Sequence, residues 1–189
     1  MTHQRRAFLL GAASLALAPG ALWARQMDGD FEIPEHLWAR RVRVRDDAPA
    51  AQIHVLTQQF RLIFTLGGGA AYAYPIGVGV DGRAFRGEAQ VGRKAEWPSW
   101  TPTANMIARE PGLYARYAAG VPGGAPENPM GARALYLHRN GRDTMYRIHG
   151  TSQPWGVGRA ASAGCIRMFN SHVAQLYDLV PVGAPVFAK

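Results

Sequence analysis

From about position 51 the chain is a series of short runs in which apolar and polar residues alternate, the pattern of half-buried strands. QIHVLT (52–57) and FRLIFTL (60–66) flank Gln58 and Gln59, which predicts a hairpin. Three glycines at 67–69 then lead into the alternating run AYAYPIGVGV. With 22 glycines and 13 prolines, the chain favours many turns over a few long helices.

The second half of the chain carries another hairpin and the clearest helix. ARALYLHRNGRDTMYRIHG (132–150) predicts two strands joined around Asn140–Gly141, the strongest short hairpin signal. Asn170 is a good helix N-cap, and apolar residues then recur at helical spacing, which predicts a short amphipathic helix to about Leu179. The final segment, PVGAPVFAK, is predicted to close as a strand.

Residues 97–131 interrupt the strand pattern with a stretch rich in proline, glycine and aromatic residues. Met106–Arg109 suits a helical turn that Pro111 would end. Long stretches without regular structure are uncommon in compact domains and are usually functional loops or disordered. Because the aromatic content argues against disorder, we interpret this stretch as a lid or wall over a site.

The N-terminus has the pattern of an export signal. Arg5 and Arg6 precede a short apolar stretch and a small-residue exit at Ala24. The pair resembles a twin-arginine signal, although nearby residues depart from its strongest form and leave the ordinary export route open. The apolar stretch is too short to span a bilayer, so we expect no transmembrane segment in the mature chain and delivery to the periplasm. We expect three regions: an export signal over 1–24, an N-terminal arm or linker over 25–50, and the main domain over 51–189.

The formal net charge of +8 comes from basic residues scattered along the sequence, which favours a solvated surface. Attraction to a polyanionic polymer is the alternative interpretation. No nucleic-acid-binding motif accompanies the charge, so we expect no nucleic-acid partner. One cysteine and scattered histidines give no metal-ligand cluster, so we expect neither a metal nor another cofactor.

The single cysteine, Cys165, lies in ASAGCIRMFN (161–170). A lone cysteine is a buried structural thiol, an intermolecular partner or a nucleophile. The preceding Ser162, Ala163 and Gly164 let the backbone bend close to a bound group, and successive N–H groups of such a turn can hold an anion. A thiol beside that turn has the elements of acyl transfer, and such a thiol is expected to be accessible and partly thiolate near neutral pH.

A thiol nucleophile needs a base, and His149 is the best placed of the six histidines. It ends a predicted strand and precedes Gly150, so its ring can project toward the loop that follows. A satisfied strand-end histidine with no catalytic role is an equally good interpretation of this residue alone.

The segment from Ile148 to Met168 resembles the signature of the YkuD-type L,D-transpeptidase catalytic domain. It contains a His-Gly-Thr step at 149–151 and Ser-x-Gly-Cys-Ile-Arg at 162–167. The resemblance extends over about Gln52 to Phe187. It implies that the main domain is a mainly β catalytic domain of mixed sheets or a sandwich, with few short helices. It also implies action on peptidoglycan stem peptides, with a tetrapeptide donor and an amine acceptor.

The resemblance also implies roles for individual residues. Cys165 would attack the donor carbonyl and His149 would take the thiol proton. The Gly150 carbonyl would orient the imidazole, and backbone N–H groups of Ala163, Gly164 and Cys165 would form an oxyanion hole.

Three nearby positions qualify the resemblance. Much of the family has histidine where this chain has Ala163, so His149 is the one candidate base in the motif. Arg86–Ala89 replaces a more usual Thr-Pro-x-Gly step, so substrate contacts there do not carry over. Arg167 would share a strand face with Cys165, and we interpret it as substrate-binding or thiolate-supporting, with a structural ion pair as the alternative.

Several functions fit the same residues. The leading hypothesis is L,D-transpeptidation through a thioester, and an outer-membrane protein is an alternative acceptor. A hydrolase, either an L,D-carboxypeptidase or an amidase, would use the same nucleophile with water as the acceptor. A peptidoglycan-binding module that has lost its chemistry is the non-enzymatic alternative, and retention of both Cys165 and His149 counts against it.

Overall fold

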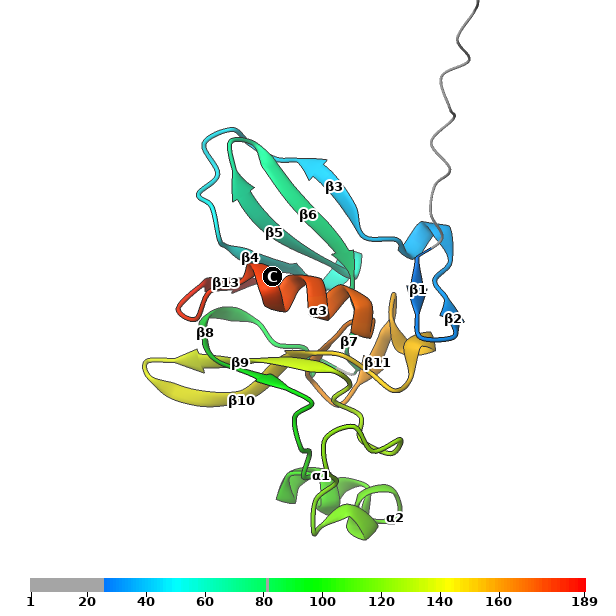
Figure 1. The fold of residues 1–189 in the computed structure, drawn as a ribbon. Helices are drawn as coiled ribbons and strands as arrows, with labels where there is room; N and C mark the ends of the chain where they lie inside the picture. The colour runs from blue at the N-terminus through cyan, green and yellow to red at the C-terminus, as the bar shows by residue number, and fades with distance from the viewer. Residues whose placement is uncertain (1–25, 81) are drawn as a thin grey trace, which may run out of the picture.

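The computed structural model describes residues 26–80 and 82–189, so the predicted export signal lies outside the described residues. Its main feature is one strongly curved sheet of nine strands (Figure 1). The pairs β10–β12 and β4–β13 are parallel, and the other neighbours are antiparallel. In spatial order the strands are β12 (Ile166–Arg167), β10 (Arg142–His149), β9 (Arg133–Arg139), β8 (Gly87–Glu96), β13 (Pro185–Ala188), β4 (Ile53–Leu56), β5 (Arg61–Gly67), β6 (Ala70–Pro75) and β3 (Arg40–Arg43).

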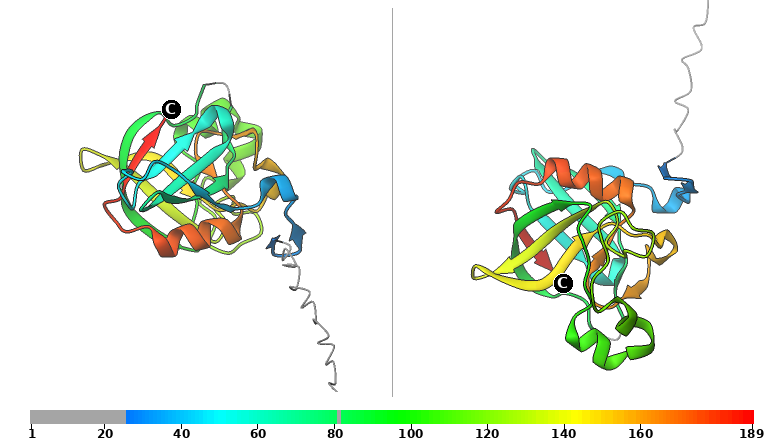
Figure 2. Two further views of the ribbon diagram at one scale, coloured as in Figure 1. Left: turned by 90° about the horizontal axis from the view of Figure 1, so that it is seen from above. Right: turned by 60° about the horizontal axis from the view of Figure 1, so that its bottom comes forward.

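Helix α3 (Asn170–Leu179) supplies the centre of the core. It lies between the two halves of the sheet in Figure 1, and its fully buried Val173 and Leu176 belong to one cluster with side chains from both halves. Full burial of such a side chain contributes roughly 1.5–3 kcal/mol. The sheet's curvature, visible from two further sides in Figure 2, lets this one helix pack against both halves of the sheet.

Both hairpins predicted from the sequence are present. β4 and β5 pair antiparallel across a short 3-10 turn, η2 (Thr57–Gln59). β9 and β10 pair across Asn140 and Gly141, whose φ angles of +51° and +74° are those of the tight turn that an Asn-Gly pair favours. The mainly β architecture with few short helices is therefore confirmed.

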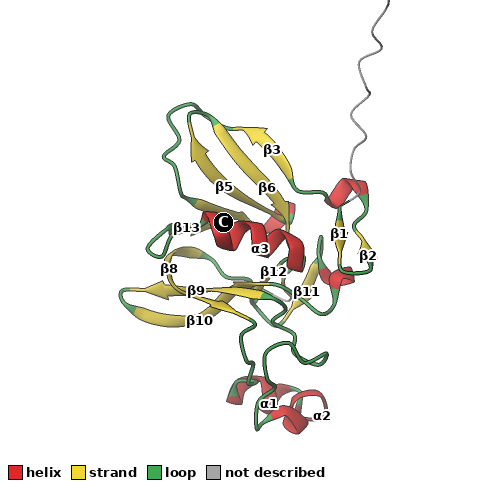
Figure 3. Ribbon diagram, viewed as in Figure 1, coloured by secondary structure: helices red, strands yellow, loops and turns green. Residues whose placement is uncertain are grey.

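The stretch 97–131 is more regular than its sequence indicated. It forms α1 (Ala104–Arg109), α2 (Pro111–Tyr114) and η3 (Ala115–Tyr117), which stand apart from the sheet in Figure 3. Thr103 caps α1 through its side chain, and Pro111 both follows the end of α1 and occupies the first position of α2. We call residues 97–131 the lid segment.

Residues 26–50, which belong to the predicted N-terminal arm, contain regular structure. Strands β1 (Met27–Asp28) and β2 (Phe31–Glu32) form a small hairpin, followed by η1 (Glu35–Leu37) and by β3, which completes one edge of the large sheet. Asp28 accepts a hydrogen bond from the backbone of Ser171, and Gln26 contacts His172 at 2.8 Å. The arm therefore docks against the start of α3. Among the described residues, no helix is long and apolar enough to cross a membrane.

Candidate active site

His149 is the last residue of β10, and Cys165 immediately precedes the neighbouring strand β12 at one edge of the sheet. In the parallel β10–β12 pair, Ile148 faces Ile166 and His149 faces Arg167. Both isoleucines are fully buried in the core, so His149 and Arg167 point to the opposite face. Extending the register back by one pair sets Cys165 opposite Arg147, on that same face.

A short two-stranded sheet leads directly into residues 163–165, the bend that contains Cys165. β11 (Ala160–Ser162) pairs parallel with β7 (Val78–Gly79), and Gly77 exchanges two backbone hydrogen bonds of 2.8 Å with Arg167. The chain that follows β6 thus meets strand β12 on the far edge of the sheet. A Cβ on Gly79 would lie 2.9 Å from the Gly164 Cα, so only glycine permits this approach of the two backbones.

His149 is buried, with 5% of its surface exposed. Its Nδ1 lies 2.6 Å from the Gly150 carbonyl oxygen, the contact expected from the sequence. Because a carbonyl can only accept, the proton is on Nδ1 and Nε2 carries the lone pair. Burial and the Arg167 charge lower the pKa of His149 to about 4, so the ring is neutral at pH 7.

The Cys165 thiol is half-buried, and its Sγ lies 3.9 Å from the Met145 carbonyl oxygen. Burial raises the pKa of this thiol, although the Arg147 backbone N–H and the charges of Arg147 and Arg167 act in the opposite direction. The expectation of a partly ionised thiol near neutral pH is therefore wrong for the resting protein. The thiol and the His149 imidazole are both neutral at pH 7, so any reaction of this sulfur as a thiolate would need a base to remove its proton.

The turn before the cysteine is held by its own serine. The Ser162 hydroxyl donates to the Cys165 carbonyl oxygen at 2.6 Å and accepts from the Gly164 N–H at 3.2 Å, so Ser162 is a turn residue, as expected. The Gly164 N–H, expected in the oxyanion hole, is engaged in this turn. Gly164 has φ +153°, and a Cβ there would crowd Tyr146.

Arg167 pairs with His149 in the sheet and is near Tyr114 of the lid segment. One of its terminal nitrogens lies 3.5 Å from Gln153 Oε1, and its buried Nε has no hydrogen-bond partner among the described residues. The charges of Cys165 and Tyr114 both act on its guanidinium. An arginine in this position can receive a carboxylate or another acceptor from a bound molecule.

Asn170 does not cap α3. The N-cap position belongs to Phe169, and Asn170 is the first residue of the helix. Its amide side chain turns the other way: Oδ1 accepts from the backbone N–H groups of Ala132 and Thr151 at 2.9 and 3.2 Å, and Nδ2 donates to the Thr151 carbonyl oxygen at 2.7 Å. The residue therefore joins the segment after the lid to the segment after His149, and sequence periodicity gave no signal of this role.

The lid segment reaches the site through charged and aromatic side chains. Glu110 lies 3.8 Å from Arg83, whose carbonyl oxygen accepts from the Tyr146 hydroxyl at 3.3 Å. Tyr114 is close enough to Arg167 for that charge to affect its pKa, which burial raises. The interpretation of this stretch as a wall beside the site agrees with these contacts.

Three of the other four histidines of the described region pack within the fold, and His36 is exposed. His54 stacks on Phe187, the ring of His138 lies over Gly92, and His172 is buried against Tyr74 and Phe169. Within residues 26–80 and 82–189, no group of three or more His, Cys, Asp or Glu side chains is placed to hold a metal.

The comparisons with known proteins decide the family. The family model of the L,D-transpeptidase catalytic domain matches residues 50–187, which is most of the chain. The chain belongs to this family. The segment from His149 to Arg167 and the strands beside it lie inside the matched region.

Two curated relatives agree with the family model. "Probable L,D-transpeptidase ErfK/SrfK" of Escherichia coli is 42% identical over 60% of this chain and 35% of its own length. The chain thus corresponds to about a third of that relative. "Putative L,D-transpeptidase in ATP synthase subunits region ORF 5" of Fuscovulum blasticum is 32% identical over 97% of this chain and 96% of its own length.

A solved structure from Brucella melitensis is also similar. It is 40% identical, covers 80% of this chain and 92% of its own, and superposes with a TM-score of 0.57. That protein is described as a probable carnitine operon oxidoreductase, which differs from the names of the curated relatives. The family is established by the family model and by those relatives, and the solved structure adds likeness of fold and sequence.

Proposed function

We propose that this protein is an exported L,D-transpeptidase that acts on peptidoglycan stem peptides with Cys165 as nucleophile and His149 as base. The observation that carries the proposal is the register of β10 and β12, which sets His149 opposite Arg167 and, extended back along the chain, sets Cys165 two positions from His149 on the same face. The ring keeps its proton on Nδ1 by bonding the Gly150 carbonyl, which leaves Nε2 to accept the thiol proton.

The first half-reaction forms a thioester. His149 Nε2 takes the Cys165 proton as the sulfur attacks the carbonyl that links the third residue of the stem to its terminal D-alanine. Backbone N–H groups of Ala163 and Cys165 stabilise the tetrahedral oxyanion. The C–N bond then breaks, and the D-alanine amine leaves with the proton returned by Nε2.

The second half-reaction transfers the acyl group. The acceptor amine loses a proton to Nε2 as it attacks the thioester, and the sulfur leaves to recover that proton as the thiol. Arg167 binds a carboxylate of the donor stem, a role supported by its unpartnered Nε and its position beside both Cys165 and Tyr114. The acceptor is a second stem peptide or, in the alternative, an outer-membrane protein.

The test uses a purified disaccharide-tetrapeptide as sole substrate and mass analysis of the products. A cross-linked dimer with release of D-alanine supports transpeptidation. Tripeptide without dimer means that water is the acceptor and the enzyme is a carboxypeptidase. An unchanged substrate with intact protein contradicts the proposed activity and favours a binding module.

Location belongs to the same proposal, because peptidoglycan lies outside the cytoplasm. We propose export by the twin-arginine route and action in the periplasm, supported by Arg5 and Arg6 before a short apolar stretch. Replacing both arginines by lysine should retain the protein in the cytoplasm. Normal export of that variant would contradict the twin-arginine route and leave the ordinary secretion route.

A further inference from the structure

Strand β10 is irregular beside the thiol. Asp143 pairs with His138 and Arg147 pairs with Tyr136, so β10 advances four residues while β9 advances two. Met145, inside this bulge, has a left-handed backbone with φ +64°. Such a conformation costs about 1–3 kcal/mol in a residue with a side chain and persists only where the surroundings hold it.

The Asp143 carboxylate holds the bulge together. Its Oδ1 accepts from the Met145 backbone N–H at 2.7 Å, and its two oxygens accept from the Arg147 guanidinium at 2.7 and 2.8 Å. In a regular strand, residues four apart are separated by roughly 13 Å, so this contact exists only because the strand is bulged. The Arg147 side chain is 12% exposed and lies over the Tyr136 ring, 4.3 Å from its centroid.

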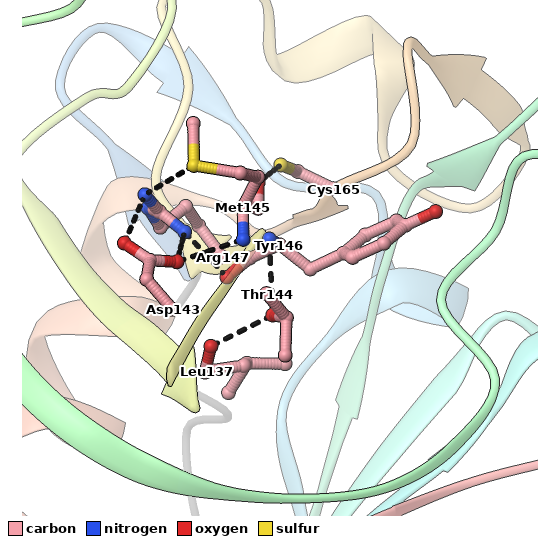
Figure 4. Close-up of polar contacts among 7 residues, drawn as sticks. All are labelled: Leu137, Asp143, Thr144, Met145, Tyr146, Arg147 and Cys165. Carbon is pink, nitrogen blue, oxygen red and sulfur yellow. Dashed lines mark hydrogen bonds and ion pairs between the residues drawn. The ribbon is translucent and has the colours of Figure 1, made fainter. Parts of the chain in front are cut away.

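The same bulge faces Cys165 (Figure 4). The Met145 carbonyl oxygen lies 3.9 Å from Sγ, and the Arg147 backbone lies opposite the cysteine in the extended register. The two groups act on the sulfur in different ways, because the carbonyl accepts the S–H proton while the Arg147 N–H and guanidinium favour the anion. The segment that Asp143 holds is therefore the segment that sets the surroundings of the thiol.

We propose that Asp143 is a positioning residue for Cys165: its carboxylate fixes the bulge so that the Met145 carbonyl and Arg147 face the thiol. The proposal rests on the proposed function, since it assigns Cys165 as the nucleophile. Asp143 positions the thiol's neighbours through Met145 and Arg147, and its own charge also acts on the sulfur.

Other charged groups near the thiol also affect its pKa. Arg167 from β12 lowers the thiol pKa together with Arg147, whereas Asp143 raises it. His149 lies on the same face and is neutral near pH 7. Removing the Asp143 charge therefore leaves two guanidinium groups unopposed near the sulfur and should lower the thiol pKa.

The test compares Asp143→Asn and Asp143→Ala with wild type. Asp47→Ala is the matched control, because Asp47 forms a comparable two-oxygen pair with Arg45 in the N-terminal arm. Two rates are measured for each full-length mature protein: alkylation of the thiol by iodoacetamide as a function of pH, and acylation by a carbapenem followed by intact mass. Thermal melting reports stability separately.

Each variant has its own expected result. Asp143→Asn keeps an acceptor for Met145 and loses the charge, so its alkylation midpoint should move to lower pH while acylation stays within about threefold. Asp143→Ala releases both partners, so acylation should fall at least tenfold, consistent with the cost of a small misplacement. Asp47→Ala should match wild type in both rates.

Unchanged alkylation midpoints in both Asp143 variants, with acylation within twofold of wild type, would overturn the proposal. If Asp143→Ala does not fold, the Asp143→Asn midpoint decides alone, and a wild-type value contradicts the proposal. A failure of the proposed function would give a different result from a failure of the Asp143 proposal. In that case wild type itself gives no adduct at Cys165, whereas the alkylation midpoints still report whether Asp143 controls the thiol.

Discussion

His149 lies opposite Arg167 in the parallel pair of β10 and β12, and this register sets it two positions beyond Cys165 on the same face of the sheet. The proposed base thus ends a strand of the sheet edge, and the proposed nucleophile lies in the bend directly before the neighbouring strand. Arg167 lies opposite His149, and Arg147 lies opposite Cys165 when the register is extended back along the chain. The imidazole and thiol are both neutral at pH 7, so in the proposed mechanism a proton transfer must accompany attack by the sulfur.

The pKa of His149 predicts how acylation depends on pH. A histidine with a pKa of about 4 is an active base above that value and is inactivated as it takes up a proton below it. We expect the rate of carbapenem acylation to be flat from pH 8 to about pH 5 and to fall tenfold per unit below about pH 4. Stopped-flow or quenched mass measurements check this, and a midpoint near 6.5 would contradict a buried, neutral His149.

Asn170 should matter to activity as well as stability. Asn170→Ala leaves two buried N–H groups and one carbonyl without their partner, at a cost of about 1–3 kcal/mol for each group left unsatisfied. We expect a strongly lowered melting temperature and at least a tenfold loss of acylation rate, because the segment after His149 loosens. Asn170→Asp keeps the acceptor oxygen, so its melting temperature and acylation rate should lie between those of wild type and Asn170→Ala.

The matched control for this prediction is Asn105→Ala, an exposed asparagine on α1. Its melting temperature should stay close to that of wild type. Equal effects of the alanine change at positions 105 and 170 would show that Asn170 does not join the two segments.

Gly150 should tolerate no side chain. A Cβ there would overlap Asn170 Oδ1 and lie 3.0 Å from the Ala132 backbone nitrogen, so Gly150→Ala must push apart the contacts that orient His149. We expect a loss of stability of about 1–3 kcal/mol and a loss of acylation. Gly112→Ala is the control, because a Cβ at that helical position meets open space and should be neutral or slightly stabilising. Urea titration with an acylation assay separates the outcomes, and equal behaviour of the two variants would contradict the crowding.

Much of this arrangement follows from the sequence, and the limits have physical causes. Asn140–Gly141 predicts its hairpin because few residue pairs accept two positive φ angles, and the His149 and Cys165 motif is local. Asn170 was misassigned because an N-cap is defined by nearby residues, whereas its partners Ala132 and Thr151 are distant in the chain. The bulge at Met145 likewise depends on its partner strand, and nothing in the alternation of β10 indicates two extra residues.

Acid should destabilise the fold through two buried histidines. Burial lowers the pKa of His149 and of His172 to about 4, below the value near 6.5 of an unfolded chain. Their contribution to stability is complete above pH 6.5 and is lost as the pH falls toward 4, because unfolding then takes up protons. Two such groups give a slope of about 2.7 kcal/mol per pH unit in the free energy of unfolding, and His172→Gln should roughly halve it. Urea unfolding from pH 7 to 4.5 checks this, and a slope that His172→Gln leaves unchanged would contradict the assignment.

The role of Cys165 predicts a pattern among three proteins. Wild type should be acylated by a carbapenem, a mimic of the acyl donor. Cys165→Ser should fold normally, because the change in size is small, and should give no adduct and no turnover, since a serine hydroxyl is far harder to ionise. His149→Ala should keep the thiol but lose about 10²–10⁴-fold in acylation rate, the usual contribution of a general base.

The measurement that tests the central claim most directly is intact-mass spectrometry after carbapenem exposure, with peptide mapping of the adduct. A single adduct on the peptide that contains Cys165, absent from Cys165→Ser and slowed in His149→Ala, is the predicted result. An adduct on any other peptide, or full cross-linking activity in Cys165→Ser, would contradict the mechanism.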